Sequence, residues 1–183
     1  MSRKLNDLSR AVSHALRHEP WLYELELDEE GWTSVDTLIA ALQLDTDWRS
    51  VTRDDIAEMI RTSSKQRHEM ADGRIRALYG HSVTGKLRKM PSAPPDVLFH
   101  GTAPATVSAI RQQGLLAMTR QYVHLSVDRE MAQAVGQRKG PVPAILTVNA
   151  RQAAMDGVTF YVGNDKVWLA DQVPARYIVF DAG

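Results

Sequence analysis

Arginine and histidine side chains stand together at two places in the N-terminal half of the chain, where they could bind a phosphate group. Arg17 and His18 end an expected amphipathic helix over residues 3–18, and the run Lys65-Gln66-Arg67-His68 is expected on a strand. Arginine is always protonated and can hold phosphate through two parallel N–H groups. Each group alone has a simpler explanation: basic residues complement a helix dipole at its C-terminus, and a basic strand can be merely solvated.

Three polar segments in the C-terminal half are further candidates for a ligand site. His100-Gly101-Thr102 follows the apolar run Val97–Phe99, so we expect this triad at a strand end, where the glycine lets a ligand approach the backbone. His124 and Ser126 are two residues apart on an expected strand and therefore share a face. Arg138 lies in a glycine-flanked loop. For the first segment, the alternative is an ordinary turn at the end of a strand. For the second, it is a partly buried histidine whose hydrogen bonds are satisfied. The loop alone does not make Arg138 catalytic.

The composition narrows the classes of protein that these residues could serve. The 183 residues include no cysteine, which excludes disulfides, zinc-thiolate sites and cysteine nucleophiles. The six histidines are scattered without paired carboxylates, so we expect no metal site. The polar N-terminus does not resemble a secretory signal, and no apolar run approaches the roughly 20 residues that span a bilayer. We expect a cytoplasmic protein, not bound to a membrane, and a monomer because no apolar assembly stripe is evident.

The formal net charge of zero hides a segregation of charge along the chain. Between Glu19 and Glu58 there are 12 acidic and 2 basic residues, whereas between Arg61 and Lys89 there are 8 basic and 2 acidic residues. A local basic patch is typical of proteins that bind a phosphate-rich partner. A solvated charged face is the alternative.

The N-terminal half must position the first two basic groups, and its pattern predicts three helices followed by a hairpin. The second helix follows from the apolar stripe Val35–Leu42 with Thr33 or Ser34 as cap, and the third begins at a capping box, Thr52 with Asp55, and ends near Arg61. Two strands should flank Asp72-Gly73, with Ile75, Ala77 and Tyr79 on one face and Arg74 and Arg76 on the other. This order is that of a winged-helix lobe over residues 1–89, although other small α+β domains share it.

The C-terminal half carries a different pattern, so we expect a second lobe over residues 97–183 after a proline-rich linker over residues 90–96. Helices are expected at Pro104–Gln113 and Asp128–Gln137. Strands are expected at Val97–His100, Tyr122–Val127, Ala144–Val148, Val158–Tyr161, Lys166–Leu169 and Tyr177–Phe180. The fold class is therefore α+β, and this lobe should be a mainly antiparallel, curved sheet with two covering helices.

Seven short segments occur in the order and spacing of one known family. They are Leu16-Arg17-His18-Glu19-Pro20, the Gly31-Trp32 turn, Lys65-Gln66-Arg67, Ile75-Arg76-Ala77 leading into Gly80-His81-Ser82, His100-Gly101-Thr102, Val123-His124-Leu125-Ser126 and Gly136-Gln137-Arg138. On these segments the chain resembles the RNA 2′-phosphotransferases, which remove the splice-junction 2′-phosphate after tRNA ligation in fungi. The resemblance extends through Gly157–Tyr161 to Val167–Leu169 and so covers nearly the whole chain.

The resemblance implies a winged-helix RNA lobe joined to an ADP-ribosyltransferase-like lobe that binds NAD⁺. It implies a catalytic set of Arg17, His18, Arg67 and Arg138, and an NAD⁺-binding set of His100 and His124 with Gly101, Thr102 and Ser126 nearby. We further expect Lys65, Arg74 and Arg76 to neutralise RNA phosphates. One position departs from the family, where a large apolar residue commonly follows Lys-x-Arg and this chain has His68.

The reaction that the resemblance implies consumes NAD⁺ as a co-substrate and needs no metal. The RNA 2′-phosphate displaces nicotinamide, and the ribose 2″-hydroxyl then attacks that phosphate, which releases 2′-hydroxyl RNA and ADP-ribose 1″,2″-cyclic phosphate. Residues 157–169 contain no glutamate to assist a neutral acceptor, which favours an anionic one. Two alternatives remain open: an ADP-ribosyltransferase that modifies nucleic-acid ends or small acceptors and stops after the first step, and a non-enzymatic winged-helix protein that binds nucleic acid.

Overall fold

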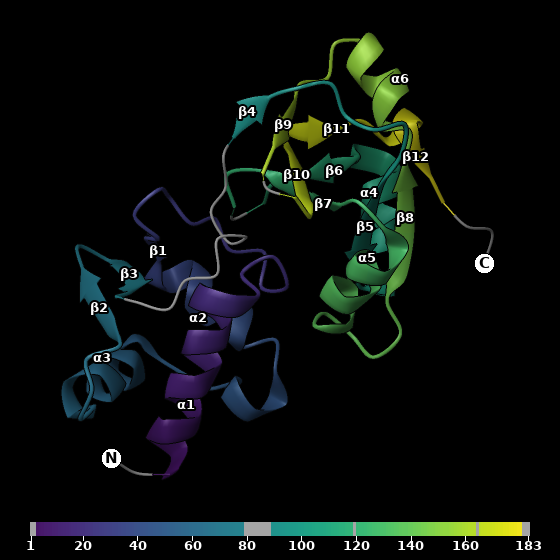
Figure 1. The fold of residues 1–183 in the computed structure, drawn as a ribbon. Coiled ribbons are helices and arrows are strands. Elements are labelled where there is room, and N and C mark those ends of the chain that lie inside the picture. The colour runs from purple at the N-terminus through teal and green to yellow at the C-terminus, as the bar shows by residue number, and fades with distance from the viewer. Residues whose placement is uncertain (1–2, 79–88, 119, 164, 181–183) are drawn as a thin grey trace. The chain divides into compact units, whose positions relative to one another are not determined.

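The chain folds into two compact units, Met1–Leu87 and Arg88–Gly183, in a computed structural model that describes residues 3–78, 89–118, 120–163 and 165–180 (Figure 1). The expected Tyr79 of the hairpin and the Gly80-His81-Ser82 segment lie outside these described residues. Helices and antiparallel strands both occur, as the α+β prediction requires.

The first unit contains the three predicted helices and the predicted hairpin. Its elements are α1 (Arg3–Ser13), a π-helical turn (His14–His18), β1 (Thr33–Ser34), α2 (Val35–Leu42), a 3₁₀ turn (Thr46–Trp48), α3 (Arg53–Thr62), β2 (His68–Ala71) and β3 (Arg74–Ala77). The helix ends are set by the predicted side chains: the Ser34 hydroxyl accepts from the Thr37 amide, and Thr52 and Asp55 form a capping box. The apolar faces of the helices meet in one core, which includes Leu8, Val12, Leu16, Leu38, Ile56, Met59 and Ile75.

The hairpin joins a small antiparallel sheet in the order β1-β3-β2. Asp72 and Gly73 have φ angles of 50° and 73°, which a tight two-residue turn between antiparallel strands requires. Ile75 and Ala77 share a face of the hairpin, as predicted, and this face is buried in the core. The prediction that the whole basic run lies on the first strand of the hairpin was wrong. Lys65, Gln66 and Arg67 precede β2, and only His68 belongs to this strand.

The second unit is built on a seven-stranded antiparallel sheet in the order β12-β8-β5-β7-β10-β9-β4. Its strands are β4 (Met90–Pro91), β5 (Leu98–Thr102), β7 (Val123–Ser126), β8 (Ala144–Val148), β9 (Phe160–Val162), β10 (Val167–Ala170) and β12 (Ile178–Val179), with β6 (Leu115–Leu116) and β11 (Gln172–Val173) as a separate pair. Its helices are α4 (Val107–Gln113), α5 (Arg129–Gln137) and α6 (Ala150–Met155), with 3₁₀ turns at Pro104–Thr106 and Ala175–Tyr177.

Several of these elements were not predicted. The expected linker over residues 90–96 includes β4, which pairs with β9. The sequence patterns also did not identify β6, β11 or α6. The two expected helices are present, and Gly114 ends α4 with a φ of 79°.

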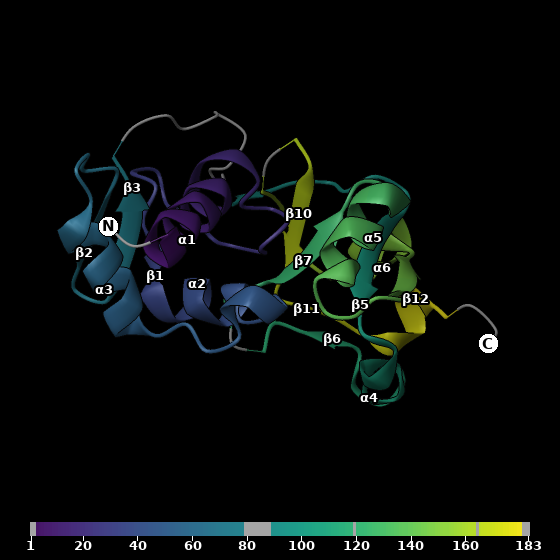
Figure 2. The same cartoon turned by 90° about the horizontal axis from the view of Figure 1, so that it is seen from below.

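The two faces of the sheet are covered by different helices, α4 on one and α5 on the other. Leu98 on the first face packs in a core with Ile110 of α4. On the opposite face, a Cβ atom added at Gly101 would lie 1.8 Å from the carbonyl oxygen of Ala132 in α5. The close packing of α5 against β5 therefore requires a glycine at this position (Figure 2).

Candidate functional site

In the first unit, two of the predicted catalytic arginines lie next to one another. Arg17 is in the π-helical turn, and its Nη2 donates to the main-chain carbonyl of Arg67 at 3.2 Å. That carbonyl also accepts from the amide of Leu78 at 3.0 Å, which fixes the start of the hairpin. Both arginines are half-buried, whereas His18 is exposed at the end of the turn. The fold thus gathers Arg17 and Arg67, which are far apart in the sequence.

His68, the position that departs from the family pattern, is a buried neutral histidine beside these arginines. Its ring Nε2 lies 3.1 Å from the Ser13 hydroxyl, and only 3% of the residue is exposed. Burial, together with the nearby charges of Arg17 and Arg67, lowers the pKa of His68 to about 4. An uncharged imidazole therefore joins the end of α1 to the start of β2 at neutral pH.

The turn that carries Arg17 and His18 is held by a residue that the sequence analysis did not assign to the site. His14 Nδ1 lies 3.0 Å from the Tyr23 hydroxyl, and its Nε2 lies 3.2 Å from a Glu19 carboxylate oxygen. The Glu19 amide donates to the His14 carbonyl at 3.0 Å, which closes the wide turn. Isolated π turns are frequent at functional sites. The position of His14 four residues before His18 was the only signal in the sequence.

In the second unit, part of the predicted NAD⁺-binding set lines a cavity of about 290 Å³. His100 and Thr102 of β5 contribute to its wall, and Thr102 contacts the Thr106 hydroxyl at 2.8 Å. The remaining wall is mostly apolar and carries two cations. It consists of Thr106, Ala109, Ile110, Gln113, Gly114, Leu115, Leu116, Met118, Arg120, Val123 and Lys139.

The other predicted residues of this set lie against the opposite face of the sheet. Phe99 pairs directly with Ser126, and partners across an antiparallel pair project to one face, so Ser126 and His124 share the face of Gly101 and α5. His100 and Thr102 project to the other face, and neither His124 nor Ser126 contributes to the described cavity wall. The predicted set is therefore divided between the two faces.

The two histidines are nevertheless in contact through the main chain. Strand β5 pairs with β7 only at Phe99 and Ser126, whereas it pairs with β8 over five residues. At the neighbouring position, the His100 ring Nδ1 lies 3.0 Å from the carbonyl oxygen of His124. This contact fixes the orientation of the imidazole that faces the cavity.

The loop after α5 brings a cation to the cavity that the sequence analysis did not single out. Lys139 lines the wall, and its Nζ donates to the carbonyl of Gly101 at 3.1 Å. The predicted catalytic Arg138 caps the C-terminus of α5 and is half-buried. Arg120, which precedes β7, is a second unpredicted cation of the wall.

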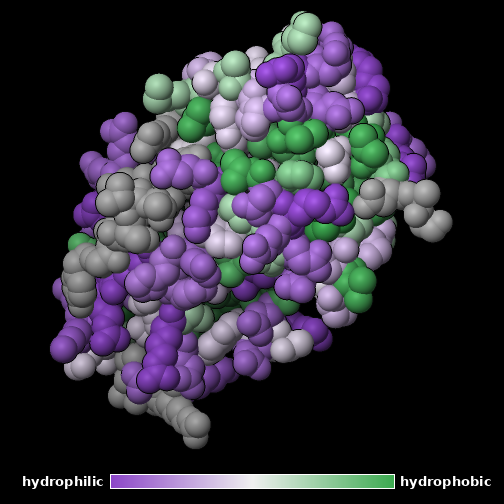
Figure 3. All heavy atoms as spheres, turned by 45° about the vertical axis from the view of Figure 1, so that its right-hand side comes forward, coloured by the Kyte–Doolittle hydropathy of each residue, from purple (hydrophilic) through white to green (hydrophobic). Residues whose placement is uncertain are grey.

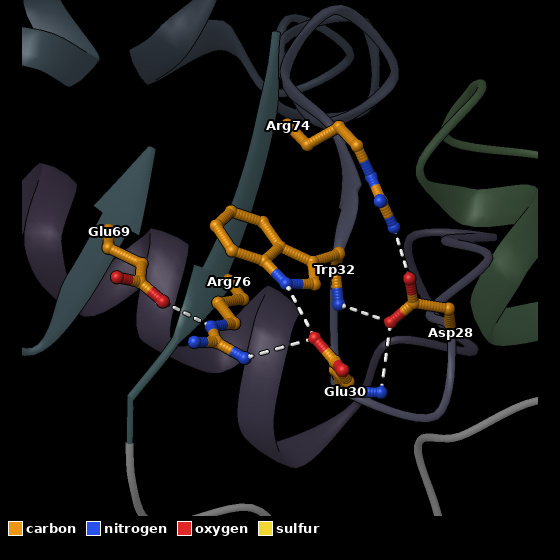
Figure 4. Close-up of polar contacts among 6 residues, drawn as sticks. All are labelled: Asp28, Glu30, Trp32, Glu69, Arg74 and Arg76. Carbon is orange, nitrogen blue, oxygen red and sulfur yellow. Dashed lines mark hydrogen bonds and ion pairs between the residues drawn. The ribbon is translucent and has the colours of Figure 1, made fainter. Parts of the chain in front are cut away.

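The two hairpin arginines expected to bind RNA are held by carboxylates of the first unit (Figure 4). Arg74 bonds Asp28, and Arg76 bonds Glu69 and lies 3.6 Å from Glu30. Burial raises the pKa of Asp28, but this effect is outweighed by hydrogen bonds from the Trp32 amide, the Arg74 side chain and the Glu30 amide, which leave it below its usual value. Lys65, the third expected RNA contact, is exposed.

The surface of the first unit is mainly hydrophilic on the face drawn in Figure 3, while hydrophobic side chains reach the surface over the second unit. Among the described residues, no group of histidine, aspartate and glutamate side chains is arranged to hold a metal ion. No helix in the described ranges combines the length and apolar character needed to cross a membrane.

Comparison with known proteins identifies the family. Residues 3–172 match the family described as "RNA 2'-phosphotransferase, Tpt1 / KptA family". A protein of Bacillus thuringiensis subsp. konkukian, named "Probable RNA 2'-phosphotransferase", is 50% identical over 175 residues, which cover 96% of this chain and 95% of that protein. Proteins with the same name from Acetivibrio thermocellus and Pseudomonas paraeruginosa are 49% and 44% identical and cover 95% and 97% of this chain, and 96% and 98% of their own lengths. The chain therefore belongs to the RNA 2′-phosphotransferase family.

Proposed function

We propose that this chain is an NAD⁺-consuming transferase that removes an internal 2′-phosphate from RNA and passes it to ADP-ribose. The match of residues 3–172 to the family carries the proposal. The pairing of Arg17 with the main chain of Arg67 supports it, because two guanidinium-bearing residues are brought together as a phosphate site requires. We further propose a winged-helix first unit, an ADP-ribosyltransferase-like second unit, and a monomeric, cytoplasmic enzyme.

The described cavity suits part of a dinucleotide. Its volume of about 290 Å³ is close to the lower end of the range for ligand pockets, roughly 300–1,000 Å³. Its apolar wall, including Ile110 and Leu115, could cover a base, and Arg120 and Lys139 carry the charge that a pyrophosphate needs. His100, oriented by the His124 carbonyl, would contact the ribose next to nicotinamide. We assign His124 and Ser126 to the support of this strand, because they face α5.

In the first proposed step, an oxygen of the RNA 2′-phosphate attacks C1″ of the ribose, and the bond to nicotinamide breaks with its electron pair leaving on nicotinamide. The nucleophile is already an anion, so this step needs positioning rather than deprotonation. Arg17, Arg67 and Arg138 would hold the phosphate oxygens. The product is RNA joined through its phosphate to ADP-ribose.

In the second proposed step, the ribose 2″-hydroxyl attacks phosphorus, and the bond from phosphorus to the RNA 2′-oxygen breaks. One proton leaves the attacking hydroxyl, and one reaches the RNA oxygen. We assign this proton transfer to the imidazole of His18, which follows Arg17 and is exposed at the end of the turn. Negative charge spreads over the phosphate oxygens, and each arginine could contribute about 3 kcal/mol to the stabilisation of that charge.

The arginines can be tested by replacement. Arg67→Ala and Arg138→Ala should each lower turnover by roughly 100-fold or more, or trap RNA joined to ADP-ribose, if each contributes about 3 kcal/mol. The exposed Arg49 and Arg151 offer matched controls, one in each unit, and their replacement by alanine should leave turnover unchanged. The assay follows phosphate loss from an oligoribonucleotide with one internal 2′-phosphate. Full activity of either variant would remove that arginine from the site.

A further inference from the structure

Six residues at the surface of the first unit are linked by polar contacts, and we call this set the arginine clasp: Asp28, Glu30, Trp32, Glu69, Arg74 and Arg76 (Figure 4). Arg76 joins Glu69 on the neighbouring strand of the hairpin to Glu30 in the loop before β1. Arg74 joins the same loop through Asp28. The clasp therefore ties the hairpin to a segment that is distant in the sequence.

Trp32 lies at the centre of the clasp, and both guanidinium groups lie over its ring (Figure 4). The Arg76 guanidinium carbon is 4.6 Å from the centre of the Trp32 ring, and that of Arg74 is 5.6 Å away. The indole Nε1 donates to Glu30 at 3.3 Å, and the Trp32 amide donates to Asp28 at 2.9 Å. Each of the two arginines therefore makes a cation–π contact with Trp32 and an ion pair with at least one carboxylate.

The charges of the clasp oppose an RNA phosphate. Two arginines face three carboxylates, so the set has a net negative charge at neutral pH. A phosphate that approached Arg74 or Arg76 would have to displace a carboxylate and would still lie near the others, and like charges at such short range repel. The partly buried Arg76, 29% exposed, would also lose its cover from Trp32.

The start of the same hairpin, at Lys65 and Arg67, differs from the clasp because its charged side chains are basic. Lys65 is exposed and Arg67 half-exposed, and within the described part of the chain neither forms an ion pair with a carboxylate. The main chain of Arg67 is joined to Arg17, so three cationic side chains come from this one region. At Lys65 and Arg67, a phosphate backbone would meet cationic charge without displacing a carboxylate.

We propose that bound RNA follows the surface formed by Lys65, Arg67 and Arg17, and that Arg74 and Arg76 serve the arginine clasp instead of contacting RNA. The proposal rests on the proposed function, since it takes RNA as the partner. It assigns the two hairpin arginines a structural role, and it places the RNA strand at the start of the hairpin.

The salt dependence of RNA binding tests this assignment, because each neutralised phosphate of a single strand contributes roughly −0.7 to the slope of log K against log salt concentration. The probe is a fluorescently labelled oligoribonucleotide with one internal 2′-phosphate, titrated at several salt concentrations. Lys65→Gln should reduce the steepness of the slope by roughly 0.7. Arg74→Gln and Arg76→Gln should leave the slope unchanged but lower the midpoint of thermal unfolding.

A second variant tests the clasp without removing an arginine. Glu30→Gln with Glu69→Gln removes both carboxylates that hold Arg76, so this guanidinium becomes available and RNA should bind more tightly with a steeper slope. A reduced slope in Arg74→Gln or Arg76→Gln, or unchanged binding in the double glutamine variant, would overturn the proposal. If wild-type protein does not bind the probe at all, the proposed function fails first.

Discussion

The buried histidine at position 68 makes the stability of the first unit depend on pH in a way that one substitution removes. The pKa of His68 is about 4 in the folded chain because burial and the charges of Arg17 and Arg67 disfavour the imidazolium. An exposed histidine in the unfolded chain has a pKa near 6.5. Between these values the unfolded state binds a proton that the folded state excludes. The contribution of the neutral His68 to the free energy of unfolding is therefore fully present above about pH 6.5 and is lost as the pH falls towards 4.

The size of the effect follows from these two pKa values. Lowering the pH from 7.5 to 5 should cost the folded state about 2 kcal/mol through this histidine alone. His68→Phe keeps a ring of similar size in the buried position and has no group that titrates, so it should lack this loss. Ser13→Ala removes the hydrogen-bond partner of His68 but leaves the imidazole buried, so it should keep most of the pH dependence.

Urea unfolding of the wild-type and variant proteins at pH values from 7.5 to 5 measures the difference. Tryptophan fluorescence is a suitable signal because Trp21, Trp32 and Trp48 belong to the first unit and only Trp168 to the second. The unfolding free energies of wild type and His68→Phe should converge or cross as the pH falls, by about 2 kcal/mol over the range. If the two proteins lose stability in parallel, His68 is not held neutral and the reasoning is refuted.

Two further substitutions test the packing that positions the site. Gly101→Ala would place a Cβ 1.8 Å from the Ala132 carbonyl oxygen, so it should destabilise the second unit by about 3 kcal/mol or more, whereas Gly140→Ala, with nothing within 4 Å, should be nearly neutral. Thermal unfolding followed by circular dichroism compares the pair, and equal midpoints would contradict the packing. Thr52→Ala removes the capping box shared with Asp55 and should lower the free energy of unfolding, measured in urea, by about 1 kcal/mol. An unchanged midpoint would show that the cap does not stabilise the helix.

The elements that the sequence predicted well are those whose determinants are local. The capping box at Thr52 and Asp55 and the turn at Asp72-Gly73 are set by residues within a few positions, and both are present. Strand β4 depends instead on pairing with β9, far along the chain, and its proline suggested a linker. Helix α6 was missed although Asn149 is a common cap residue, because its six residues are too few to show a helical periodicity in the sequence.

The candidate site was predictable in residue type but not in arrangement. The sequence indicated His100 and His124 as one set, but strand register decides the face of each, and it separates their side chains. Sequence spacing likewise placed Arg74 and Arg76 on the outer face of the hairpin without showing the carboxylates that hold them. Charge compensation between distant segments has no local signal, so the basic pattern alone did not show that Arg74 and Arg76 are ion-paired.

The central claim is that phosphate removal requires NAD⁺ and passes through ADP-ribose. Its most direct test incubates the purified protein with NAD⁺ and an oligoribonucleotide carrying one internal 2′-phosphate, and quantifies every product by chromatography and mass spectrometry. The account predicts nicotinamide, ADP-ribose 1″,2″-cyclic phosphate and 2′-hydroxyl RNA in equal amounts, and no reaction without NAD⁺. Release of inorganic phosphate without NAD⁺, or RNA that keeps ADP-ribose with no cyclic phosphate formed, would contradict it.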